Sequence, residues 1–131
     1  MTSPDLDLEP GIDPDAWRGR RCRRCATVAY GAAGTCPRCL ADDAEVLELS
    51  LAGVVWTTTV QRFAPKSPPY VPPADGFRPF AVVYVELPEG LRVEGVVPPS
   101  AGGERRVAIG DRVRLVATGP VPTFEPEERS R

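Results

Sequence analysis

Histidine is absent from this chain of 131 residues, and lysine occurs only at Lys66. Because histidine is the commonest general base, its absence excludes the Ser-His and Cys-His arrangements of nucleophilic catalysis. The sequence also lacks the glycine-rich Gly-x-x-x-x-Gly-Lys-Ser/Thr and Gly-x-Gly-x-x-Gly motifs that hold phosphates. No apolar run approaches the roughly 18 residues that a membrane span needs. These absences argue against an enzyme that acts alone and against a membrane protein.

Charge is nearly balanced, with 16 Lys and Arg against 18 Asp and Glu. Nucleic-acid-binding domains are usually basic, so no nucleic-acid partner is expected. Glu86, Glu89 and Glu94 gather near one expected hairpin, where we expect solvated side chains rather than a catalytic pair. Residues 1–20 contain no apolar signal segment, and reduced cysteines without an export signal predict a cytoplasmic protein.

All four cysteines of the chain, Cys22, Cys25, Cys36 and Cys39, form two Cys-x-x-Cys pairs separated by ten residues. This spacing is typical of a zinc ribbon, in which each pair turns tightly and a hairpin brings the two pairs together. Four thiolates complete a tetrahedral Zn²⁺ site and leave no position for water or substrate. The sequence therefore predicts a structural zinc ion.

Three other interpretations of the cysteines remain open. A thioredoxin-like redox site has no role for the second pair, and a disulfide framework usually belongs to a secreted chain. A four-cysteine iron–sulfur cluster generally has other spacings. Zinc is favoured because residues 16–39 contain six arginines and no acid, which would offset the charge of −2 that four thiolates leave on Zn²⁺.

The chain divides into four expected regions. Residues 1–13 are acidic and Pro-rich and are expected to form a flexible tail. Region 14–44 should hold a short helix from Pro14 to about Arg20, capped by Asp13, followed by the ribbon. Trp17 would pack on the ribbon or on a partner. Region 45–118 should form the main β domain, and 119–131 a disordered tail.

Hydrophobic alternation with a period of two predicts strands throughout region 45–118. The expected strands are 47–51 and 53–63, which could be one strand bent at Gly53, and then 80–87, 91–97, 106–109 and 112–117. We expect Val54, Trp56, Thr58 and Val60 to share one face of their strand, and two sets to face the core: Ala81, Val83, Val85 and Leu87, and Val113, Leu115 and Ala117. Counting the bent strand once gives five strands, which favours a closed OB-fold barrel.

The loop at 64–79 holds six prolines. It is long for a compact barrel, and such loops are often functional. Prolines reduce the entropy lost on docking, and aromatic side chains among them suit a protein partner or an apolar ligand. Candidate contacts are Trp17, Arg62, Lys66, Tyr70, Phe77 and Arg78. The alternative is a solvated connector with Tyr70 or Phe77 folded onto the barrel.

Several segments together resemble the DUF35 family across roughly residues 14–118. They are Cys-Arg-Arg-Cys, Ala-Thr-Val-Ala-Tyr, Cys-Pro-Arg-Cys, Gly-Val-Val-Trp-Thr-Thr-Thr-Val, Pro-Phe-Ala-Val-Val-Tyr-Val-Glu-Leu and the closing Val-Ala-Ile-Gly-Asp-Arg-Val-Arg-Leu. The resemblance implies a rubredoxin-like zinc ribbon followed by an OB-fold. This chain departs from the family pattern directly after each Cys-x-x-Cys turn, or knuckle, where Ala26 and Leu40 stand in place of the usual glycine.

The same resemblance implies a non-catalytic accessory subunit in a heteromeric complex of lipid metabolism. Its partner would be a thiolase-superfamily enzyme acting on acyl-CoA: a thiolase, an acyl-CoA synthase or a lipid-transfer-protein-like aldolase. The small subunit would stabilise that enzyme and help to position the CoA ester. The alternatives are a zinc ribbon and OB module that binds single-stranded nucleic acid, and a stand-alone acyl-CoA-binding protein or weak thioesterase.

Overall fold

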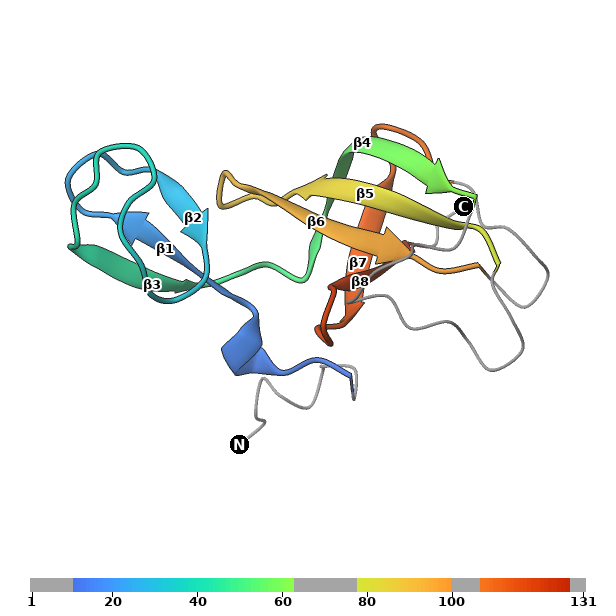
Figure 1. The fold of residues 1–131 in the computed structure, drawn as a ribbon, viewed down its shortest axis with the longest axis horizontal. Coiled ribbons are helices and arrows are strands. Elements are labelled where there is room, and N and C mark those ends of the chain that lie inside the picture. The colour runs from blue at the N-terminus through green and yellow to red at the C-terminus, as the bar shows by residue number, and fades with distance from the viewer. Residues whose placement is uncertain (1–10, 63–77, 100–106, 128–131) are drawn as a thin grey trace.

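The computed structural model describes residues 11–62, 78–99 and 107–127, and it is built almost entirely from β-strands (Figure 1). A small three-stranded sheet, which carries the cysteines, lies beside a closed five-stranded barrel. The elements in chain order are the 3₁₀ turn η2 (Pro14–Ala16), β1 (Arg18–Cys22), β2 (Val28–Tyr30), β3 (Ala44–Glu48), β4 (Ala52–Gln61), β5 (Phe80–Glu86), β6 (Arg92–Val97), β7 (Arg112–Ala117) and β8 (Thr123–Pro126).

The ribbon sheet has the order β2-β1-β3, and both pairings are antiparallel. Strand β3 pairs with β1 from Arg18–Glu48 to Cys22–Ala44. The expected boundary after residue 44 is therefore wrong, because β3 belongs to the ribbon and β4 begins the barrel. The two strands follow each other closely in the sequence, and only the pairing partner reveals which sheet each one joins.

The barrel has the strand order β4-β5-β6-β8-β7 and closes where β7 pairs with β4. All its pairings are antiparallel except that of β6 with β8. This connectivity confirms the predicted OB-fold. Closure gives every strand two neighbours, so no edge is left exposed.

The identity of the last two barrel strands differs from the prediction. Residues 107–109 form no strand, so β7 is the fourth barrel strand and β8 the fifth. The expected disordered tail 119–131 thus contributes a barrel strand, in which Phe124 is fully buried. Its prolines suggested disorder, but β8 is short and the burial of one aromatic side chain stabilises it.

The N-terminal side of the ribbon also differs. Of the expected flexible tail 1–13, residues 1–10 lie outside the described part of the chain. The next residues are ordered against the barrel: Ile12 is buried, and Gly11 forms a β-bridge with Ala117. The expected helix is only the single turn η2, where the Asp13 side chain accepts a hydrogen bond from the Asp15 N–H. Strand β1 begins at Arg18, because its backbone pairs on both sides, with β2 and β3.

Core-facing positions on β5 and at its end follow the prediction, since Ala81, Val83, Val85 and Leu87 are all buried. Val113 and Leu115 are also buried, as expected. Ala117 is only half-buried, because the register with β8 shifts between Leu115 and Ala117.

Strand β4 contains a bulge that breaks its predicted alternation. Val55 pairs with Val85, but the next pair is Thr57 with Tyr84, which leaves Trp56 as the extra residue. Beyond the bulge Thr58 pairs with the buried Val83 and so shares the inward face, whereas Trp56 is exposed. Thus Val54, Trp56, Thr58 and Val60 do not share one face, because a bulge reverses the alternation after it.

Trp17 joins the ribbon to the barrel. Its ring makes edge contacts with Tyr30 of β2 and with Phe124 of β8, at centroid distances of 5.8 and 6.1 Å. Its Nε1–H donates to the Ser50 carbonyl oxygen at 2.9 Å, and the Ser50 hydroxyl donates to Glu89 at 2.7 Å. Trp17 packs on the ribbon, which is one of the two expected alternatives, and only 3% of its surface is exposed.

Gly95 of β6 lies where Phe124 leaves no room for a side chain. A Cβ atom at this position would lie 2.5 Å from Phe124 Cε2 and 2.7 Å from the Pro122 carbonyl oxygen. We expect Gly95→Ala to lower the free energy of unfolding by about 1–3 kcal/mol through overpacking, measured by urea denaturation. The Phe124→Leu background should reduce this loss, and an undiminished loss there would show that Phe124 is not its cause.

Candidate metal centre and exposed surfaces

The two cysteine pairs form a matched pair of knuckles. In the first, the Ala26 N–H donates to the Cys22 carbonyl oxygen, and in the second the Leu40 N–H donates to that of Cys36, both at 2.9 Å. Each turn ends in a residue with a positive φ, 69° at Ala26 and 68° at Leu40. Glycine adopts this conformation more easily than alanine or leucine does.

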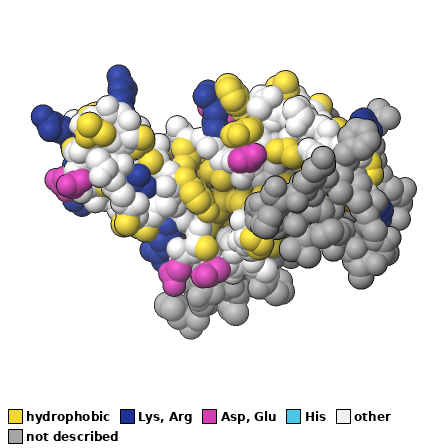
Figure 2. Space-filling view, viewed as in Figure 1, with side chains coloured by type: hydrophobic (Ala, Val, Ile, Leu, Met, Phe, Trp, Pro, Cys, Tyr) yellow, Lys and Arg dark blue, Asp and Glu magenta, His cyan; other side chains and the backbone are white. Residues whose placement is uncertain are grey.

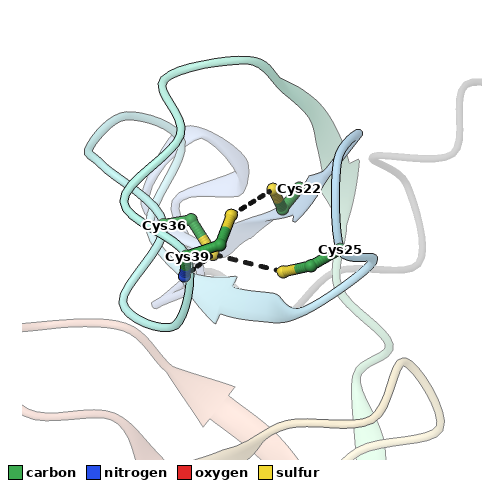
Figure 3. Close-up of side chains that lie close together, drawn as sticks. All are labelled: Cys22, Cys25, Cys36 and Cys39. Atoms are coloured by element: carbon green, nitrogen blue, oxygen red, sulfur yellow. Dashed lines mark hydrogen bonds between the residues drawn. The ribbon is translucent and has the colours of Figure 1, made fainter.

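The four cysteine sulfurs converge on one point between the knuckles (Figure 3). All four lie within 4.8 Å of one another, with 3.5 Å between Cys22 and Cys39 and 3.6 Å between Cys25 and Cys36. None of the cysteines is in a disulfide. A tetrahedral ion with metal–sulfur bonds of about 2.3 Å separates its sulfurs by about 3.8 Å, so this cluster fits one such ion.

Backbone N–H groups point at the sulfurs and favour their charged form. Cys22 accepts from the Arg24 N–H and Cys36 from the Arg38 N–H, each at 3.4 Å. Hydrogen bonds from the side chain and backbone of Thr27 lower the pKa of Cys25 to about 6.

Cys39 behaves in the opposite way. A hydrogen bond from the Ala41 backbone lowers its pKa, but burial and the three neighbouring cysteines outweigh it and raise the pKa to about 11. Cys25 and Cys39 therefore do not ionise together by themselves at neutral pH. A bound cation is what would hold all four as thiolates.

Most of the ribbon arginines have partners other than the cysteine cluster. Arg18, Arg21 and Arg23 form ion pairs with the carboxylates of Asp15, Glu45 and Asp43, which lie outside the acid-free segment 16–39. The Arg20 guanidinium donates to three ribbon carbonyl oxygens, those of Tyr30, Gly31 and Thr35. Of the six arginines in segment 16–39, Arg24 and Arg38 have no such partner among the described residues and remain to offset the charge of the site.

An aromatic surface that the sequence analysis missed lies on the outside of β4, β5 and β6. Trp56 and Tyr84 are 46% and 40% exposed, and the Arg92 guanidinium lies 3.9 Å from the Trp56 ring centroid. Arg92 also pairs with Glu86 at 3.5 Å. The outward position of Tyr84 could have been predicted, because it lies between the core residues Val83 and Val85. The exposure of Trp56 could not, because it depends on the bulge in β4. Hydrophobic side chains also gather on the part of the barrel surface that lies next to the ribbon (Figure 2).

The other residues that the sequence predicted to contact a partner or acyl-CoA lie in or beside the loop 64–79. Arg62 and Arg78 are exposed and lie at the same end of the β4–β5 pair, since Gln61 pairs with Phe80. Lys66, Tyr70 and Phe77 lie outside the described residues, as does almost all of the loop 64–79. Among the described residues, no helix is long and apolar enough to cross a membrane.

A four-cysteine ribbon followed by a closed OB barrel defines the class of this protein. The family model described as "ChsH2, C-terminal OB-fold domain" matches residues 47–118. The chain belongs to this family, the DUF35 family.

Proteins similar to the chain include two curated relatives and a solved structure. A "DUF35 domain-containing scaffold protein" from Methanocaldococcus jannaschii is 32% identical over 60% of this chain and 52% of its own length. The "Benzoylsuccinyl-CoA thiolase subunit BbsA" from Thauera aromatica is 29% identical over 78% and 66%. The "Ltp2-ChsH2(DUF35) aldolase" matches with a TM-score of 0.57 and 26% identity, over 90% of this chain and 98% of that chain. The chain thus spans about half to two thirds of the curated relatives.

Proposed function

We propose that this chain is a non-catalytic subunit that binds and stabilises a thiolase-superfamily enzyme acting on acyl-CoA substrates. The observation that carries the proposal is the structural match to a chain of the Ltp2-ChsH2(DUF35) aldolase, which covers 90% of this chain. The relative named as a thiolase subunit supports the same role. In such a complex the partner would supply the reacting groups, and this chain would hold part of the enzyme surface in place.

The metal in this proposal is a structural Zn²⁺ held by Cys22, Cys25, Cys36 and Cys39. Their separations fit a tetrahedral ion, and four protein thiolates would leave no position for substrate. When bound, the ion would fix the two knuckles relative to each other. The residues of this chain would do the rest: the N–H groups of Arg24 and Arg38 stabilise the thiolates, and Thr27 holds Cys25.

The exposed barrel surface supports a protein partner over single-stranded nucleic acid. Single-strand binders combine stacking aromatics with a basic groove. Here Trp56 and Tyr84 lie beside Glu86, which neutralises Arg92, and beside the exposed Glu94. Exposed Trp, Tyr and Arg are the residue types that contribute most at protein interfaces.

Co-expression with a thiolase-superfamily subunit from the same organism tests the proposal. We expect the two chains to elute together in size-exclusion chromatography, and the enzyme to lose activity or soluble yield when this chain is omitted. Calorimetry of the isolated chain with CoA esters and with single-stranded oligonucleotides serves as the control, and we expect no binding. A chain that stays monomeric beside that enzyme and leaves its activity unchanged would refute the proposal.

A further inference from the structure

Leu40 combines two features that are individually tolerable and together unusual. It is 74% exposed, and its φ of 68° lies in the left-handed region. A single exposed leucine is ordinary on a protein surface. A branched side chain in left-handed backbone is not, since that conformation costs roughly 1 kcal/mol for any residue other than glycine. Glycine at this position would remove both the strain and the exposed apolar surface.

The first knuckle provides an internal comparison. Ala26 occupies the equivalent position, with the same backbone hydrogen bond and nearly the same φ of 69°. The hydrogen bond therefore does not require a large side chain at this point in the turn. Leu40 is also absent from the buried cluster that forms the core and from the partly buried residues packed against it. Nothing in the described fold accounts for a leucine at position 40.

Two cations without an ion-pair partner among the described residues lie on the same pair of knuckles. Arg24 immediately precedes the ligand Cys25, and Arg38 immediately precedes Cys39, so both flank the four-sulfur cluster. Both are exposed, and neither forms an ion pair with any residue that the structure describes. The nearby carboxylates already have partners: Asp42 accepts a hydrogen bond from Thr35, and Asp43 pairs with Arg23. The knuckle end thus presents one apolar side chain and two cations.

We propose that this end of the ribbon, formed by Leu40, Arg24 and Arg38 and here called the knuckle tip, docks on the thiolase-superfamily subunit. The complementary surface on that subunit is an apolar socket for Leu40, edged by carboxylates that pair with the two arginines. Charge complementarity of this kind sets the orientation and the association rate, and burial of Leu40 slows dissociation. This inference rests on the proposed function and specifies which surface of the chain carries it.

The variant Leu40→Gly separates docking from structure, because it removes the side chain and also relieves the strained backbone. We expect its urea midpoint to equal or exceed that of the wild type. Its dissociation constant for the thiolase-superfamily subunit that binds the wild type should rise at least tenfold, as measured by calorimetry. Ala26→Gly is the matched control: it relieves the same strain, and its dissociation constant should stay within twofold of wild type.

Two arginine variants test the electrostatic part. Arg24→Gln and Arg38→Gln should slow association and weaken its dependence on salt, whereas Leu40→Gly should mainly speed dissociation. If the wild type does not bind the enzyme subunit, the proposed function itself fails. If the wild type binds and Leu40→Gly binds equally well, only the knuckle tip is refuted. A lower urea midpoint for Leu40→Gly would make Leu40 a structural residue and would also overturn the inference.

Discussion

Cys36→Ser is expected to abolish stoichiometric metal binding and to unfold the ribbon. Cys36 is buried, its sulfur lies 3.6 Å from that of Cys25, and it accepts hydrogen bonds from the N–H groups of Arg38 and Cys39. Structural zinc contributes about 10–16 kcal/mol to small zinc domains, and most of that free energy depends on a complete set of thiolates. A three-stranded sheet has too little core to replace it.

Metal content by mass spectrometry gives the direct measurement, with about one ion per chain expected for the wild type and almost none for the variant. The same measurement identifies the metal, since the four sulfurs alone do not distinguish zinc from iron. Thr35→Ala is the control: it removes an exposed ribbon hydroxyl that bonds to Asp42, and it should keep the metal. Full metal retention by Cys36→Ser would contradict the four-cysteine site.

The barrel should respond less than the ribbon to loss of the metal. Most residues of its core cluster come from the segment between β4 and β8, and none of them is a cysteine. We therefore expect that a chelator such as EDTA will make the NMR signals of the folded ribbon disappear, whereas most signals of the folded barrel will persist. Loss of both sets at once would show that Trp17 makes the two parts unfold as one cooperative unit.

Trp17→Ala is expected to lower the free energy of unfolding by about 3–5 kcal/mol, the usual loss for a large buried aromatic residue. The side chain fills the contact between the ribbon and the barrel, against Tyr30 and Phe124. Its removal also leaves the Ser50 carbonyl without the indole N–H. We expect the ribbon to lose its fixed orientation, which chemical-shift changes in β2 and β8 would report.

The second tryptophan of the chain provides the matched control. Trp56 is about half exposed, and its main interaction is the cation–π contact with Arg92. Trp56→Ala should therefore lower the free energy of unfolding by only about 0.5–1 kcal/mol. Each variant keeps one tryptophan, so the intrinsic fluorescence assigns each emission. The Trp17 signal should be insensitive to iodide and the Trp56 signal quenched by it. Equal losses of stability would contradict the joining role of Trp17.

Local features of the sequence predicted the cysteine cluster and the core faces of β5 and β7. The cysteine spacing is local, because each knuckle turns within five residues and brings its own two sulfurs together. Alternation on β5 was equally direct, since each inward valine is separated from the next by one outward residue. The sequence also drew attention to Leu40, because a leucine stands where the resembling family usually has glycine. Its exposure could not be predicted from the sequence.

Pairing between distant segments produced every correction. Strand β3 joins the ribbon because β1 is its partner, and Phe124 is buried because Gly95 of β6 leaves space for its ring. The bulge at Trp56 appears only when β4 is aligned with β5. By itself the sequence determined the four-cysteine cluster and the fold class, since both follow from spacing and periodicity along the chain. The tertiary structure alone decided which strand completes the barrel and that Trp17 is buried, because burial depends on which distant segment lies against a residue.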